Sequence, residues 1–286
     1  MCATHGDVPA TATCSRCGRF VCDSCTLELE PVLCAACDEL AADPFQLKRT
    51  EFSVGNSLLE GAKLAWHEAG PILAIAFVFA IPGVVIEVLI PDEPGQTLGT
   101  SWRVSILYES LVAFIGSQAV LARLIARAEG RVLPVGRAFS LSLQTWSRCL
   151  AANLRAGLSV LGYSLLLIVP GVWRSVQLTF IDVAVLRSTK DPLLVSKQFV
   201  ENRGWPVFGL VCATFATTWL PALMVTVVLG AAGELLQLQR PASFLGGWVM
   251  NISAMVQLSV SLVAYYGLAR SRGERLPVLP FRAPLA

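Results

Sequence analysis

The pattern of polar and apolar positions divides the chain near residue 50, where a polar segment gives way to long apolar stretches. Six stretches of about 20 apolar residues have the length and composition of membrane-spanning helices. They lie at about 69–90, 104–126, 151–170, 172–187, 206–232 and 244–269. The sequence therefore predicts an all-α polytopic membrane domain with about six transmembrane helices.

The fourth stretch is the weakest, because it carries Arg174, Gln177 and Asp182. We expect it to be short or tilted and packed inside the bundle. Pro170-Gly171 joins it to the third stretch and predicts a tight turn there; if the pair is only a kink, the topology changes. Ahead of the first stretch, residues 41–68 are predicted to form a linker and an amphipathic helix, with Leu58, Leu59, Ala62, Ala65 and Trp66 on one helical face.

Composition agrees with a membrane protein, since 55% of the residues are hydrophobic, 15% are charged and the mean hydropathy is +0.63. The first 40 residues lack the basic start and apolar core of a cleavable signal peptide, so we expect the first span to direct insertion. The layout is a zinc-binding module at 1–40, a linker and amphipathic helix at 41–68, a membrane domain at 69–270 and a tail at 271–286.

Positive charge predicts the orientation. On the six-helix layout, most lysines and arginines lie in the N-terminal region, the second and fourth loops and the tail, whereas Arg103, Arg174 and Arg240 lie on the opposite side. By the positive-inside rule both termini face the cytoplasm. The excess of arginine over lysine, with abundant alanine and leucine, suggests a bacterial source, and hence a multi-pass protein of the inner (plasma) membrane.

Seven of the nine cysteines and one of the two histidines form four pairs within the first 37 residues. These pairs are Cys2/His5, Cys14/Cys17, Cys22/Cys25 and Cys34/Cys37. Two intervening residues let both side chains of a pair bind the same tetrahedral ion, so eight ligands predict two closed Zn²⁺ sites. Sequential and crossed pairing both fit the spacing. Disulfides are disfavoured because they need an oxidising compartment, and the histidine and even pairing favour zinc over an iron–sulfur cluster.

The same run, with Gly18-Arg19-Phe20-Val21 between its central pairs, resembles a B-box type zinc finger, a small two-zinc cross-brace fold. The resemblance covers about the first 40 residues. It implies one zinc held by Cys2, His5, Cys22 and Cys25, and a second held by Cys14, Cys17, Cys34 and Cys37. The last pair departs from the family's commoner pattern, which has histidines there.

The segment from Val169 to Trp205 is loosely similar to the membrane domain attached to some glycerophosphodiester phosphodiesterases. The similarity rests on Pro170-Gly171-Val172-Trp173-Arg174, Asp191-Pro192, Ser196-Lys197 and Gly204-Trp205. It implies a helical membrane domain and no catalytic residue, because the enzymatic part of those proteins is a separate barrel.

No catalytic motif is evident, and His67-Glu68 does not continue as a metalloprotease H-E-x-x-H. Two sites with four protein ligands each leave no open position for a reacting water, so we expect a structural module and no enzyme. Residues 1–48 carry three basic and seven acidic side chains. This charge disfavours nucleic acid and favours a protein partner.

The resulting hypothesis is a zinc-binding integral membrane protein whose cytosolic module serves protein–protein interaction or regulation at the bilayer; self-association is left open. The alternative is a transporter or channel regulated by the zinc module. For that alternative, Asp182 is the deepest ionisable residue, and it would need a partner such as Arg155, Arg174 or Arg187. The single Cys149 and Cys212 are expected to be packing residues.

Overall fold

The structure is a computed structural model that describes residues 1–2, 7–14, 18–22, 52–90, 100–128, 132–187 and 191–271. The predicted linker up to residue 51 and the tail from residue 272 lie outside these residues. From residue 52 onward the described chain is almost entirely helical, which confirms the all-α class of the membrane domain.

The N-terminal part contains two short antiparallel strands, β1 (Ala12–Thr13) and β2 (Phe20–Val21), with Thr13 opposite Phe20. The helices of the second part are α2 (Val54–His67), α3 (Ala69–Leu89), α4 (Thr100–Tyr108), α5 (Phe114–Ala128), α6 (Val135–Leu166), α7 (Ile168–Gln177), α8 (Ile181–Arg187), α9 (Pro192–Val200), α10 (Gly204–Thr214), α11 (Leu220–Leu235) and α12 (Gln239–Ser271). Two π-helical turns, η1 (Glu109–Ala113) and η2 (Phe215–Trp219), join α4 to α5 and α10 to α11 without a break.

Six helical stretches among the described residues are long and apolar enough to cross a membrane. They run over Ala69–Ile86, Glu109–Ala128, Val135–Leu166, Ile168–Leu186, Gly204–Leu235 and Pro241–Ala269. Each predicted span therefore corresponds to a helical stretch, and the fold is that of a multi-pass membrane protein. The third stretch begins about 16 residues earlier than predicted, because α6 extends back to Val135.

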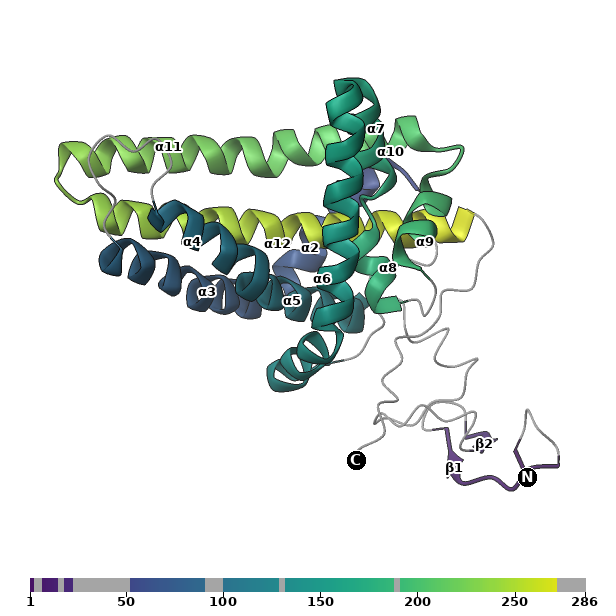
Figure 1. Ribbon diagram of the computed structural model, residues 1–286. Coiled ribbons are helices and arrows are strands. Elements are labelled where there is room, and N and C mark those ends of the chain that lie inside the picture. Colours follow the sequence, from purple (N-terminus) through teal and green to yellow (C-terminus); the bar gives the residue numbers. More distant parts are fainter. Residues whose placement is uncertain are drawn as a thin grey trace.

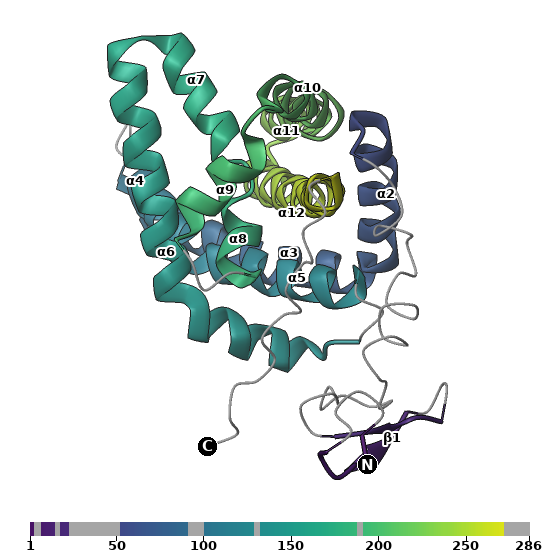
Figure 2. The same ribbon diagram turned by 90° about the vertical axis from the view of Figure 1, so that its right-hand side faces the viewer.

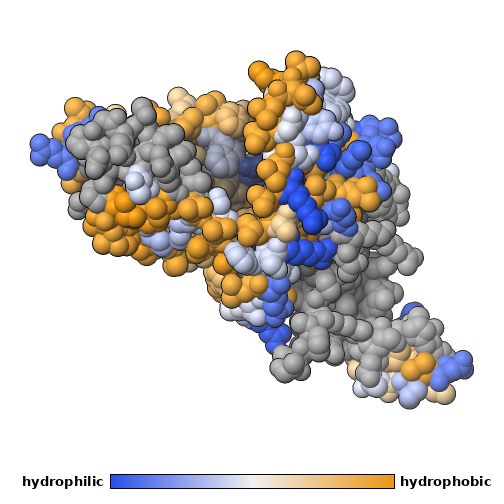
Figure 3. Space-filling view, in the orientation of Figure 1, coloured by the Kyte–Doolittle hydropathy of each residue, from blue (hydrophilic) through white to orange (hydrophobic). Residues whose placement is uncertain are grey.

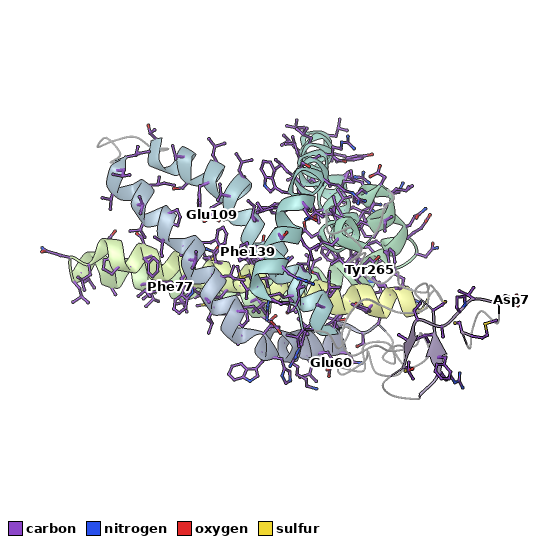
Figure 4. The ribbon with its side chains drawn as sticks, turned by 90° about the horizontal axis from the view of Figure 1, so that it is seen from below. Asp7, Glu60, Phe77, Glu109, Phe139 and Tyr265 are labelled. Carbon is purple, nitrogen blue, oxygen red and sulfur yellow. The ribbon has the colours of Figure 1, made fainter. Side chains whose placement is uncertain are left out.

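Helix α12 occupies the centre of the described membrane domain and packs against α2, α3, α5 and α11 (Figures 1 and 2). Its C-terminal half is almost wholly buried, with Leu262, Tyr265 and Leu268 among the most buried side chains. The Tyr265 ring stacks on Phe199 of α9 with the ring centroids 4.3 Å apart, deep among the helices (Figure 4). This aromatic contact ties α9 to the central helix.

The outer helices expose apolar side chains, as lipid-facing helices must. Helix α3 presents Phe77 and Val78 outward, and α11 presents Met224, Val227 and Val228. Hydrophobic residues accordingly cover large parts of the surface in Figure 3. Exposed apolar area of this extent favours a bilayer as the surrounding medium.

Helix α2 crosses α12 closely, and the contact is made by small residues. A Cβ added at Gly61 would lie 2.7 Å from the Val260 Cα atom, and the Ser259 hydroxyl donates to the Gly61 carbonyl at 2.9 Å. The amphipathic helix predicted within residues 41–68 corresponds to α2, and of its predicted apolar face Ala65 is buried. Leu59 and Trp66 face outward instead, with Trp66 80% exposed.

Helices α6 and α7 form an antiparallel hairpin that turns at Leu167, whose backbone is extended. The turn comes three residues before the predicted Pro170-Gly171. Pro170 lies in the first turn of α7, where its missing N–H costs nothing. Gly171 lets the two helices approach, since a Cβ there would lie 2.9 Å from the Ser164 Cα atom. The pair therefore marks a turn between two helices and no kink within one.

Candidate functional site

The described part of the N-terminal segment is organised around cysteines at the ends of its two strands. Cys14 follows β1 and Cys22 follows β2. The Cys14 amide donates to the Arg19 carbonyl at 2.8 Å, and the Gly18 amide donates to the Cys14 carbonyl at 2.9 Å. Gly18 has a φ of +71°, a conformation that glycine adopts without strain. These two hydrogen bonds hold the backbone of Cys14 against Gly18 and Arg19.

The backbone at Cys2 is also held in place, because its amide donates to the Val8 carbonyl at 2.9 Å. Cys2, Cys14 and Cys22 are 2%, 1% and 1% exposed. Such burial is notable in a segment with few apolar residues, where Val21 is the only other fully buried side chain among those described. Buried thiols in a polar segment have the chemistry of metal ligands.

The other five predicted ligands, His5, Cys17, Cys25, Cys34 and Cys37, lie outside the described residues. Within the described ranges, no group of three or more histidine, cysteine, aspartate or glutamate side chains is close enough to hold a metal ion. Crossed and sequential pairing both place Cys2, Cys14 and Cys22 at metals. The complete ligand set therefore stays a prediction from the spacing, and the pairing a prediction from the resemblance.

In the membrane domain, Asp182 of α8 lies in a polar cluster with residues of α5 and α6. Its Oδ1 atom accepts hydrogen bonds from Gln118 Nε2 at 3.1 Å and from Asn153 Nδ2 at 2.9 Å. The Cys149 thiol donates to Gln118 Oε1 at 3.6 Å, so Cys149 is part of this cluster. Gln118 and Cys149 are fully buried. The cluster joins three helices through uncharged donors.

Of the arginines proposed as partners for Asp182, neither Arg155 nor Arg174 forms an ion pair with it in the described part of the chain. Arg174 donates to Ser159 Oγ at 2.8 Å and to Gln177 Oε1 at 2.9 Å. Arg155 is exposed, and the side chain of Arg187 lies outside the described part. Side-chain amides donate to Asp182 in place of an arginine, because Gln118 and Asn153 project from the helices that pack directly on α8.

The predicted fourth span is interrupted between α7 and α8. Ser196 of α9 forms hydrogen bonds with the backbone groups at this interruption. The Ser196 hydroxyl donates to the Gln177 carbonyl at 2.8 Å and accepts from the Phe180 amide at 3.2 Å. Ser196 is fully buried, so these two backbone groups would otherwise lack a partner. The expectation of a short element packed within the bundle agrees with this geometry.

A buried ion pair fixes the corner between α2 and α3. Glu68 Oε2 lies 2.6 Å from Arg123 Nη2 of α5, and Glu68 Oε1 lies 3.9 Å from Arg127 Nε. Arg123 also donates to the Leu133 carbonyl, which ties in the segment ahead of α6. Sequence reasoning missed this site; the available signal was an i, i+4 pair of arginines at the end of an apolar helix.

A cavity of about 390 Å³ opens between α7, α9 and the start of α10. Its walls include Trp173 and Trp205, whose ring centroids are 5.6 Å apart, together with Lys197 and Glu201. Gly204 is required beneath the Trp173 ring, since any side chain there would overlap the indole. These residues belong to the segment on which the second resemblance rests.

The fold defines the protein as a polytopic helical membrane protein with a cysteine-rich N-terminal segment. Comparison with known proteins finds no matching family model, curated protein or solved structure. The B-box and phosphodiesterase resemblances therefore remain predictions from the residues that carry them.

Proposed function

We propose that this protein is a zinc-binding protein of the inner membrane, whose cytoplasmic N-terminal module binds a protein partner at the bilayer. The observation that carries the proposal is the burial of Cys2, Cys14 and Cys22, with backbone hydrogen bonds at Cys2 and Cys14. Each of these cysteines belongs to a different one of the four cysteine or histidine pairs. Two Zn²⁺ ions bound by the eight predicted ligands would supply the folding energy that a segment with so small a core lacks.

The proposed role of the metal follows from the number of its protein ligands, and the proposed kind of partner follows from the charge of the N-terminal segment. Four protein ligands at each ion leave no position for a substrate or an activated water, which supports a structural part for the metal. The acidic excess over residues 1–48 supports a protein partner over nucleic acid. Attachment to apolar helices would hold that partner at the membrane surface.

Bound metal in the purified full chain tests the proposal. Elemental analysis of detergent-solubilised protein should find two zinc ions per chain, and Cys34→Ser should lose at least one of them. Cys212→Ser is the matched control, because this exposed cysteine of α10 is far outside the predicted ligand set, and it should keep both ions. Iron in place of zinc, or no metal in the parent protein, would refute the proposal.

The competing candidate is a transporter or channel that the zinc module regulates. The observation in its favour is a carboxylate on a broken helix inside an apolar stretch, as at Asp182, since discontinuous helices line the sites of many transporters. Asp182 is already satisfied at one oxygen by two amides, which supports a packing role. Substitution of Asp182 separates the two candidates, as described in the Discussion.

A further inference from the structure

The α6–α7 hairpin does not run alongside the long helices of the membrane domain. Helices α11 and α12 lie side by side in Figure 1 and are seen end-on in Figure 2, whereas the C-terminal part of α6 is upright in both views and its N-terminal part runs across the view in Figure 2. Helix α6 therefore crosses them steeply. Its contacts are with α5, α7, α8 and α9, and all nine residues at the tip, 161–169, are exposed.

The distance between charged residues is too short for this hairpin to cross a bilayer. From Arg155 to the turn at Leu167 there are 12 residues, or about 18 Å of helix, and from the turn to Arg174 there are seven, or about 10 Å. A hydrocarbon core is about 30 Å thick. A tip at the far surface would thus leave both arginines at membrane depth.

Arg174 has little freedom to escape from such a position. Its guanidinium is bound to Ser159 and Gln177 and lies over the Tyr163 ring, 5.8 Å from the centroid. These contacts hold it along the hairpin, so it is not extended toward a distant interface. In a spanning hairpin the charge of Arg174 would lie at membrane depth, which is energetically costly. No acidic partner offsets this cost, since none of the ion pairs of the described residues involves Arg174.

The surface of α6 has three faces, which follow from its rotation of about 100° per residue. One face is buried against the bundle and contains Cys149, Ala152 and Ala156. The other two are exposed. The leucine row consists of Leu143, Leu154, Leu158, Leu161 and Leu165, and the arginine row, about a quarter turn away, consists of Arg137, Arg148 and Arg155.

Two adjacent exposed faces, one apolar and one basic, match the boundary between acyl chains and phosphate headgroups. Figure 3 shows hydrophobic residues over the upper tip of the hairpin, which continues the apolar surface of the bundle. A second copy of the chain is a poorer occupant, because two-fold pairing on these faces would bring arginine rows together.

We propose that α6 and α7 lie in the plane of the membrane, in the leaflet on the side of the two termini, with the leucine row in acyl chains and the arginine row at lipid phosphates. The chain then crosses the bilayer four times, through α3, α4–α5, α10–α11 and α12. Arg174 moves to the side that carries most of the positive charge, so the charge bias becomes stronger while both termini keep their predicted side.

Depth measurements along α6 test this arrangement in the full chain. A ketone-bearing amino acid at Leu143, Leu154 or Leu165, labelled with a nitroxide, leaves the native cysteines unreacted. The three positions are on one face and 11 residues, about 16 Å, apart. In bilayers of phosphatidylethanolamine and phosphatidylglycerol, oxygen and nickel-chelate collision rates should place all three labels at the same depth, within about 5 Å, just below the headgroups.

A spanning helix would instead place Leu154 about 16 Å deeper than one or both of the other labels, and this result would overturn the proposal. Labels exposed to the nickel chelate at all three positions, or shielded from oxygen by a second copy, would also overturn it. Val227 and Leu235 on α11 provide the control for a true span, with an expected depth difference of about 12 Å.

Labelling of intact cells with a membrane-impermeant maleimide gives an independent result. Ile168→Cys at the hairpin tip should stay unlabelled, as should Gly136→Cys at the start of α6. Gln237→Cys, in the exposed turn between α11 and α12, should react as the control for the opposite side. Reaction of Ile168→Cys equal to that of Gln237→Cys would show that the hairpin crosses.

Discussion

Substitution of Gly61 by alanine tests the contact that holds helix α2 on the central helix α12. The new methyl group would lie 2.7 Å from Val260 Cα, where ordinary carbon contacts are about 3.5 to 4 Å, so the helices must separate by about 1 Å. Overpacking of this kind costs about 1–3 kcal/mol. Weakening the bond from Ser259 to the Gly61 carbonyl adds about 0.5–1.5 kcal/mol.

Alanine also favours the helix by about 1 kcal/mol relative to glycine, so the net loss should be about 0.5–3.5 kcal/mol. The assay is thermal unfolding of the detergent-solubilised protein followed by size-exclusion chromatography. We expect Tm to fall by several degrees, at about 2–4 °C per kcal/mol for a chain of this order of size. Gly55→Ala is the control in the same helix, because nothing lies within 4 Å of its added Cβ. Equal Tm values for the two variants would refute the close-packing argument.

Two further substitutions test the polar sites. Glu68→Gln should destabilise the fold by about 3–5 kcal/mol, because it leaves Arg123 buried without its carboxylate; Glu60→Gln, which removes the exposed pair with Lys63, should cost at most about 1 kcal/mol. Thermal unfolding measures both variants. Similar losses of stability in the two would contradict the conclusion that burial makes the Glu68–Arg123 pair more important than the exposed pair. Asp182→Asn should lower Tm if the cluster is structural, whereas loss of ion flux in liposomes at unchanged Tm would support the transporter alternative.

The cysteine pairs show how far spacing alone can go. Regular spacing predicts which residues could bind metal, since two ligands in one tight turn must lie close together. Of the predicted ligands, Cys2, Cys14 and Cys22 are described and are buried. The polar cluster of Asp182 could be anticipated only as a buried carboxylate in need of a partner. Its donors, Gln118 and Asn153, lie 64 and 29 residues away, and no local pattern connects residues at such separations.

The sequence by itself determined that the chain is helical, that it belongs in a membrane and where its helices lie. Hydrophobic length and periodicity depend only on residues that are near one another in the sequence, so they can be evaluated without the tertiary structure. Only the tertiary structure decided how those helices are directed. The Gly61 contact with α12, the Glu68 ion pair and the turn at Leu167 each depend on which helices meet. An apolar helix of given length is compatible with crossing a bilayer or lying at its surface. For α6 and α7, the direction set by packing and the positions of Arg155 and Arg174 are the grounds on which we propose a place at the surface.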